Sequence, residues 1–314
     1  MGLLGETKPV KKPILGVSLY PEQETMEEIE NYLTMASHYG FTKIFTSMFS
    51  VPGTKEEVFD YFKNFCDLAH KHGMKVSGDC NTAFFKKMGA SESDISIFKE
   101  MGIDIIRMDL PYFDQRDVTL INNPYNITIE LSSCMIQAVR MALENGANPK
   151  NFSTCHNFYP ERYTASDLES IREVNKELSN LGIPSAVFIS SNEENTHGPW
   201  PVHDGLPTVE DHRWIPAELQ VRHWIAVGDV DEIIFGNAFA SEEEFKAIDQ
   251  VMKEAYVDIP RFEGQEFLAE LLPHGDVERV PFKVMLDDGV TDLEKEIVFD
   301  NVYHQCGETP YYMI

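Results

Sequence analysis

Hydrophobic and polar residues alternate with two different periods along most of the chain. Short runs rich in Val, Ile and Phe have the length of buried β-strands. Each run precedes a longer segment with the apolar spacing of an amphipathic helix. The β-type runs span residues 13–20, 41–48, 75–79, 104–109, 127–131, 152–156, 184–190 and 230–236. The pattern therefore predicts eight strands that alternate with helices.

The predicted helices begin and end at residues that favour helix boundaries. Thr25 precedes the first helix and Glu28 follows three residues later, which is the spacing of a capping box. Four helices are followed by the glycine that a left-handed C′ position prefers, at Gly40, Gly73, Gly102 and Gly182. These boundaries support the division of the chain into alternating strands and helices.

Strand–helix repeats of this number are typical of an α/β fold in which parallel strands close into a (β/α)8 TIM barrel. The alternative is an open doubly wound sheet, which usually has fewer strands and binds its ligand at a glycine-rich first turn. Neither G-x-G-x-x-G nor G-x-x-x-x-G-K-[ST] occurs in the chain. The sequence therefore favours a barrel domain over residues 1–258.

The composition changes after this domain. Residues 259–314 are richer in Pro, Asp and Glu and contain short β-type runs, of which the last, 311–314, ends the chain. A segment of this length is marginal as an independent domain. We expect a small β domain that packs on the barrel or that has been cut short.

Acidic residues outnumber basic ones in this chain of 314 residues. Lys+Arg total 26 and Asp+Glu total 52, which gives a formal net charge of −26. This excess argues against nucleic acid or an acidic membrane as a partner, because phosphate groups need nearby Lys or Arg. A phosphorylated small molecule remains compatible, because one or two local cations suffice to bind it.

Cysteine usage and the N-terminal segment indicate a cytoplasmic protein. The five cysteines are scattered and form no C-x-x-C pair, which disfavours a zinc ribbon or a redox site and is typical of reduced thiols. Residues 1–13 lack the apolar stretch of a signal peptide, and no run of 18 apolar residues could span a membrane.

Carboxylates follow several predicted strands, at the barrel end where TIM-barrel enzymes place their catalytic groups. Asp79 and Asp109 follow the third and fourth strands. Two carboxylates in different environments can act as acid and as base or nucleophile, which glycoside hydrolysis requires. Alternatively, Asp79 caps the next segment and Asp109 pairs with Arg107. Glu24 and Glu130 are further catalytic candidates at strand ends.

The sixth strand ends in residues that suit a sugar. His156 and Asn157 offer hydrogen bonds to hydroxyl or acetamido groups, although a buried structural histidine is the alternative for His156. Tyr159 adds an aromatic face, and Arg162 adds a guanidinium for an anion.

The segment 192–214 is long for a βα loop, and long ordered loops are often functional lids. Arg213 is a candidate anion clamp at the barrel position that often binds phosphate, and the turn at Asn237 offers N–H donors there. The loop has no H-x-x-x-H spacing or carboxylate triad, so we expect no metal at its His and Asp residues, which are His197, His203, Asp204 and His212.

Six segments together resemble the bacterial intracellular 6-phospho-N-acetylmuramidases over nearly the whole chain. They are LGVSLYPEQET, GFTKIFTSM, IRMDLPY, CHNFYPERYT, HGPW and DGLPTVEDHR. The resemblance implies a TIM barrel joined to a small cyclophilin-like β domain. That domain continues past residue 314 in the family, so residues 259–314 would be a partial, truncated copy of it.

The resemblance also implies an activity. Such a protein is a cytosolic glycosidase of peptidoglycan recycling that cleaves the β-1,4 bond of the phosphorylated disaccharide MurNAc-6-phosphate–GlcNAc, without a cofactor. The positions that match the family pattern are Asp79, Arg107, Asp109, His156, Asn157, Tyr159, Gly198, Pro199, Glu210, His212 and Arg213. Glu210, His212 and the loop residue His197 are accordingly candidate substrate-binding residues.

The combined prediction is a glycosidase in which Asp79 and Asp109 divide the acid and the base or nucleophile roles. The substrate's own acetamido group is an alternative nucleophile, as in some glycosidases. Two other functions remain open. One is a barrel isomerase or epimerase that uses the same carboxylates to move protons. The other is a non-catalytic sensor of a sugar phosphate.

Overall fold

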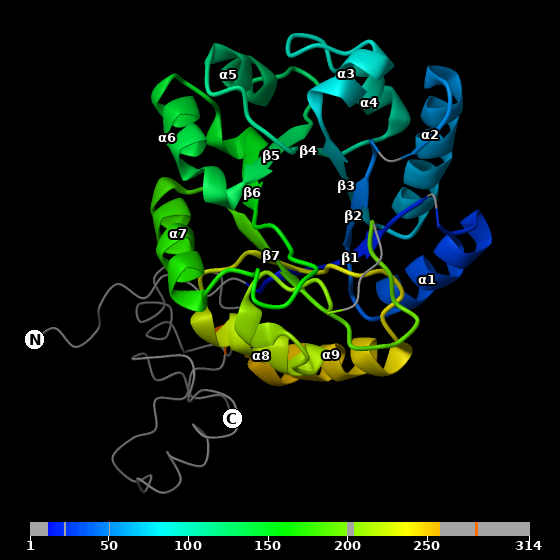
Figure 1. Ribbon diagram of the computed structural model, residues 1–314, viewed down its shortest axis with the longest axis vertical. Helices are drawn as coiled ribbons and strands as arrows, with labels where there is room; N and C mark the ends of the chain where they lie inside the picture. Colours follow the sequence, from blue (N-terminus) through cyan, green and yellow to red (C-terminus); the bar gives the residue numbers. More distant parts are fainter. Residues whose placement is uncertain (1–11, 22, 50, 200–203, 258–279, 282–314) are drawn as a thin grey trace, which may run out of the picture.

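Eight parallel strands form a closed barrel with helices on its outside (Figure 1). The computed structural model describes residues 12–21, 23–49, 51–199, 204–257 and 280–281. The strands are β1 (Ile14–Leu19), β2 (Lys43–Ser47), β3 (Lys75–Cys80), β4 (Ile105–Met108), β5 (Thr128–Ser132), β6 (Phe152–Cys155), β7 (Ser185–Ile189) and β8 (Glu232–Phe235). Each strand pairs with the next in the sequence, and β8 closes the barrel on β1. The predicted (β/α)8 barrel is confirmed.

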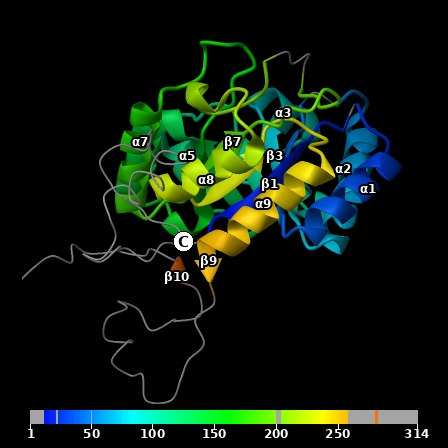
Figure 2. The same ribbon diagram turned by 90° about the horizontal axis from the view of Figure 1, so that it is seen from below.

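The helices lie outside the strands and connect them. They are α1 (Met26–His38), α2 (Lys55–Lys71), α3 (Thr82–Met88), α4 (Ser96–Met101), α5 (Gln115–Ile121), α6 (Ile136–Glu144), α7 (Leu168–Leu181), α8 (Ala217–Val227) and α9 (Glu242–Ala255). The helices α3, α5 and α8 were not predicted, and α3 and α5 are too short to show a clear apolar period. Long loops cover the barrel end seen in Figure 1, and Figure 2 shows them on the side opposite β9 (Tyr256–Val257).

Local sequence explains why the helices begin and end where they do. Thr25 accepts the backbone N–H of Glu28 in the predicted capping box, and Thr54 with Glu57 forms a second one at α2. The apolar face of α2 is buried with helical spacing, at Val58, Phe62, Phe65, Cys66 and Ala69. The four predicted glycine exits all have positive φ, between 72° and 92°.

The barrel interior holds an aromatic cluster and a buried ion-pair network. Phe45, Phe158 and Phe188 pack edge to face, with ring centroids 4.9–6.1 Å apart. At the amino end of β2, Lys43 Nζ lies 2.9 Å from Glu130 Oε2 and 2.5 Å from Glu232 Oε2. Burial opposes the charged form of Lys43, but the two carboxylates outweigh it and raise its pKa.

The predicted cyclophilin-like segment 259–314 lies outside the described residues except at β10 (Val280–Pro281). β10 pairs antiparallel with β9. In the part of the chain that the structure describes, no helix has the length and apolar character needed to cross a membrane.

Candidate active site

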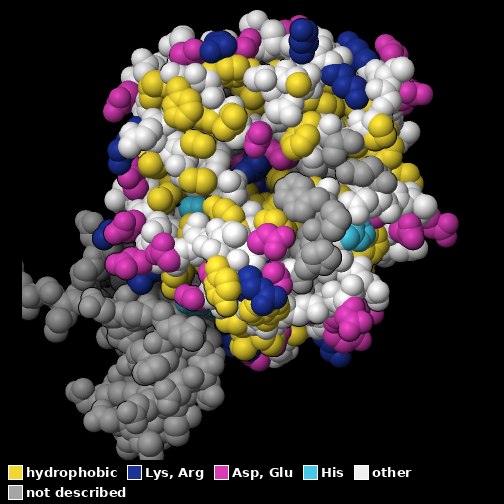
Figure 3. Space-filling view, in the orientation of Figure 1, with side chains coloured by type: hydrophobic (Ala, Val, Ile, Leu, Met, Phe, Trp, Pro, Cys, Tyr) yellow, Lys and Arg dark blue, Asp and Glu magenta, His cyan; other side chains and the backbone are white. Residues whose placement is uncertain are grey.

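The carboxyl ends of three strands bring together a carboxylate, a guanidinium and an amide. Asp79 on β3 and Arg107 on β4 are register partners, and Arg107 Nη1 donates to Asp79 Oδ1 at 2.8 Å. Arg107 Nη2 donates to Asn157 Oδ1 at 2.5 Å, just beyond β6. Figure 3 shows this barrel end hollowed over the strands, with basic and acidic side chains meeting in the hollow. This group is the candidate catalytic centre.

The two predicted catalytic carboxylates have different environments. Burial raises the pKa of Asp79, against the opposing effect of Arg107, and the charge of Asp109 raises it further. Asp109 follows β4, is exposed, and donates its backbone N–H to Cys80 O at 2.9 Å. Arg107 therefore pairs with Asp79 and not with Asp109, and Asn81 caps α3 in place of Asp79. The structure therefore shows neither of the two structural alternatives, in which Asp79 capped the next segment and Asp109 paired with Arg107.

Asn157 is held by the loop that follows β7. Thr208 Oγ1 donates to Asn157 O at 3.0 Å, and Ser132 Oγ donates to Asn157 Oδ1 at 3.3 Å. The loop lies close to β8, since a Cβ on Gly236 would be 2.4 Å from Leu206 O. Glycine at this position therefore allows the loop to support the candidate centre.

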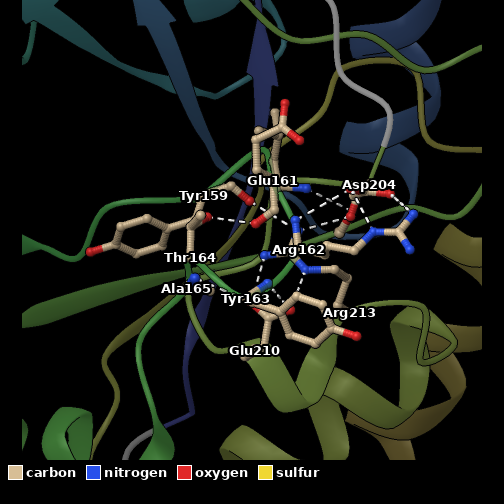
Figure 4. Close-up of polar contacts among 11 residues, drawn as sticks. Tyr159, Glu161, Arg162, Tyr163, Thr164, Ala165, Asp204, Glu210 and Arg213 are labelled. Carbon is tan, nitrogen blue, oxygen red and sulfur yellow. Dashed lines mark hydrogen bonds and ion pairs between the residues drawn. The ribbon is translucent and has the colours of Figure 1, made fainter.

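Arg213 is the centre of an interlock between the loops after β6 and β7, and its side chain is 1% exposed. It donates to Glu210 from Nε at 2.7 Å and from Nη2 at 2.9 Å, and from Nη1 to Tyr159 O and Asp204 O. Glu210 accepts the backbone N–H groups of Tyr163 and Ala165 (Figure 4). The guanidinium predicted to clamp an anion is thus engaged in holding two loops together.

Charge pairing also fixes the ionisation of this interlock. Arg213 and the two backbone N–H groups hold the pKa of Glu210 down at about 2, so Glu210 is a carboxylate at neutral pH. Arg162 pairs with Asp204 at 3.1 Å and keeps about half of its side chain exposed. The hydroxyl of Tyr159 lies 3.5 Å from Ser166 Oγ.

The structure does not bring every predicted residue to the candidate centre. His156 is buried with its Nε2 2.7 Å from Asn175 Oδ1 on α7, because side chains alternate and Asn157 takes the inward position. His212 is buried with its Nε2 2.7 Å from His223 Nδ1 on α8. Asn237 is buried in hydrogen bonds to Ser191 and Thr196. These three predicted substrate ligands contribute to packing in the fold.

Glu24 and Glu130, the other predicted catalytic carboxylates, are also engaged elsewhere. Glu130 is 0% exposed inside the barrel with Lys43. Glu24 Oε1 lies 2.6 Å from His197 Nε2, which joins the loop after β1 to the loop after β7. Sequence reasoning missed Lys43 and Thr208. An interior lysine on the second predicted strand was the available signal for Lys43, and no sequence signal marked Thr208.

A cavity of about 560 Å³ opens at the amino ends of the strands. Lys43, Lys75 and Glu232 are among its lining residues. TIM-barrel enzymes use this end for stability and the opposite end for catalysis, so the cavity is not the candidate active site. Among the described residues, no three His, Cys, Asp or Glu side chains gather so that they could hold a metal ion.

The model of one protein family, described as 6-phospho-N-acetylmuramidase, N-terminal, matches residues 15–250. The chain belongs to this family. A crystal structure of an uncharacterized B. cereus protein is 36% identical with a TM-score of 0.68, and the match covers 76% of this chain and 65% of that one. A conserved Enterococcus faecalis protein with an unknown function is 22% identical with a TM-score of 0.66 over the same shares. No curated protein matches the chain.

The family match covers the barrel, including Asp79, Arg107, Asp109 and Asn157. The chain spans about 65% of the length of the B. cereus and Enterococcus faecalis proteins. The likeness to the Enterococcus faecalis protein, at 22% identity, shows the fold alone.

The buried histidines of this barrel predict a loss of stability in mild acid. Burial lowers the pKa of His156 to about 4, although its bond to Asn175 opposes this shift. The unfolded chain takes up this proton near pH 6.5 and the folded one only near pH 4. Stability therefore falls as pH drops between these values, by about 3 kcal/mol at about 1.4 kcal/mol per pH unit.

Urea unfolding at pH 7 and pH 4.5 measures this effect. His156→Gln keeps a polar side chain but does not titrate, so it is expected to lose less stability between the two pH values than the wild type. An equal loss in both proteins would show that His156 does not contribute.

Proposed function

We propose that this protein is a glycosidase that hydrolyses the β-1,4 bond of MurNAc-6-phosphate–GlcNAc. The observation that carries the proposal is the pair of carboxylates at the barrel rim, one mostly buried beside Arg107 and one exposed. The family match supports the same reaction. A phosphorylated cell-wall disaccharide is an intracellular recycling substrate, so we also propose a cytoplasmic role in peptidoglycan recycling.

Asp79 is the proposed general acid. Burial is the main cause of its raised pKa, which favours the protonated form that an acid needs. Asp109 is the proposed base or nucleophile, because its exposed carboxylate can approach water or the anomeric carbon. The acid protonates the leaving oxygen while the second carboxylate supports the developing positive charge on the sugar.

Arg107 is the proposed cation for the anionic group of the substrate. Arg213 is bonded to Glu210, away from the candidate centre. Arg107 lies in the candidate centre, where it donates hydrogen bonds to Asp79 and Asn157. When Asp79 carries its proton, the charge of Arg107 is no longer cancelled and becomes available to an anion. A bound anion in turn raises the pKa of Asp79 further and maintains the acid in its active form.

A pair of chromogenic substrates tests the proposal. One is a β-glycoside of MurNAc-6-phosphate and the other is the same compound without phosphate. We expect kcat/KM to be about 30- to 100-fold higher for the phosphorylated compound, the size of a hydrogen bond to a charged group.

Equal cleavage of the two compounds would overturn the phosphate specificity. Binding of the phosphorylated sugar without turnover would overturn the glycosidase and favour a sensor. Conversion of a sugar phosphate to an isomer would favour the isomerase.

A further inference from the structure

Two exposed aromatic side chains lie on the loops joined by the Arg213–Glu210 interlock. Tyr163 is 83% exposed and Trp214 is 56% exposed. Both rings keep apolar surface in contact with water, which binding of a ligand would release. We call Tyr163, Trp214 and the adjacent Arg162 the aromatic shelf.

The backbone of the shelf is strained at both aromatic residues. Tyr163 has φ 65° and Trp214 has φ 64°. Positive φ is an outlier for bulky side chains, and such strain persists only when the surrounding structure enforces it. The enforcing contacts are the bond from the Tyr163 backbone to Glu210 and the pairing of Glu210 with Arg213, next to Trp214. The positive φ angles of the two residues lower the stability of the fold, and both rings remain exposed to solvent.

Arg162 fixes one side of the shelf. Its guanidinium carbon lies 5.3 Å from the centre of the Trp214 ring, and Asp204 holds it by ion pairing at 3.1 Å. Figure 3 shows a hydrophobic patch with basic side chains over it on this barrel end, near α8. Arg162 thus lies over the Trp214 ring, and 56% of that residue stays exposed to a ligand.

The charges around the shelf select a neutral ligand. Arg162 and Arg213 are each paired with a carboxylate, Asp204 and Glu210, and Glu161 adds a further exposed negative charge. Negative charges therefore outnumber positive ones around the shelf, which disfavours a phosphate group here. The flat apolar face of a sugar ring stacks on an aromatic ring, and its hydroxyl groups donate to carboxylates.

We propose that the aromatic shelf binds the neutral N-acetylated sugar on the leaving side of the scissile bond. This inference rests on the proposed function, because it identifies which half of the disaccharide each part of the rim recognises. The candidate centre at Asp79 and Arg107 takes the phosphorylated sugar, and the shelf takes its unphosphorylated neighbour. The loop that carries Tyr163 also carries Asn157, which contacts Arg107 and joins the two regions.

Kinetics with two leaving groups test the proposal. The substrates are MurNAc-6-phosphate–GlcNAc and the methyl glycoside of MurNAc-6-phosphate. Trp214→Ala is expected to lower kcat/KM about 10-fold for the disaccharide, mainly through KM, and to change it less than 2-fold for the methyl glycoside. Phe113→Ala is the matched control, because Phe113 is also an exposed aromatic with φ 57° on another rim loop but is outside the shelf.

Tyr163→Gly separates binding from folding. Glycine adopts positive φ without a Cβ penalty, so this variant is expected to weaken disaccharide binding without lowering the urea midpoint. A lower midpoint with unchanged disaccharide KM would show that Tyr163 is structural and would overturn its place on the shelf.

Direct binding distinguishes failure of the shelf from failure of the proposed function. The probe is unphosphorylated chitobiose, followed by tryptophan fluorescence in the wild type and in Trp214→Phe. A saturable change that is lost in Trp214→Phe supports the shelf even if neither glycoside is cleaved. If both glycosides are cleaved and Trp214→Ala lowers kcat/KM equally for the two, the shelf is overturned and the glycosidase stands.

Discussion

Asp79→Asn and Asp109→Asn are each expected to lower kcat for the phosphorylated disaccharide by about 10²- to 10⁴-fold. This is the usual contribution of a positioned acid or base. Asparagine keeps the size of each side chain, and at position 79 its amide oxygen can still accept a hydrogen bond from Arg107, so the barrel is expected to fold in both variants. Asp60→Asn makes the same chemical change on an exposed position of α2 and is expected to keep full activity.

The leaving group shows which carboxylate is the acid. A dinitrophenyl group departs without protonation, so Asp79→Asn should lose much less rate with such a substrate than with the disaccharide. Asp109→Asn should lose rate equally with both, because base or nucleophile is needed in each case. The opposite result would exchange the two roles. Retention of more than a tenth of wild-type activity in both variants would remove the pair from the mechanism.

Lys43→Met is expected to lower the free energy of unfolding by about 3–5 kcal/mol, the usual result of removing one partner from a buried ion pair. The change leaves Glu130, which is 0% exposed, inside the barrel without its cation. The remaining contacts of that carboxylate, to Ser77 and Ser153, are both 3.4 Å long and weak.

The matched control is Lys71→Met, which removes the same side chain from an exposed ion pair with Glu30 at 2.7 Å. Exposed pairs contribute at most about 1 kcal/mol. Urea unfolding of both variants measures the contrast. If Lys43→Met lost no more stability than Lys71→Met, the buried network would be irrelevant to the stability of the barrel.

The fold was largely predictable because its signals are local. Strand and helix periods, the capping box at Thr25 and the glycine at Gly182 each involve residues within one or two helical turns of one another. Closure of eight such units into a barrel then follows from the need to bury both faces of a parallel sheet. Positions at the carboxyl ends of strands, such as Asp79, could be assigned to the rim for the same reason.

The partners of the site residues were not predictable in this way. Arg107 is two residues from Asp109 but bonds to Asp79 and Asn157, which are 28 and 50 residues away. Strand register decides this choice, because a shift of one residue would turn Arg107 out of the barrel.

The sequence by itself determined the barrel, its acidic character and the carboxylates at its rim, because each depends on residue type and short-range spacing. Only the tertiary structure decided that Arg213 holds two loops together, that His156 faces α7 and that Tyr163 and Trp214 stay exposed. Those outcomes depend on which loops meet across the rim, and the free energy of such contacts belongs to pairs of residues far apart in the chain.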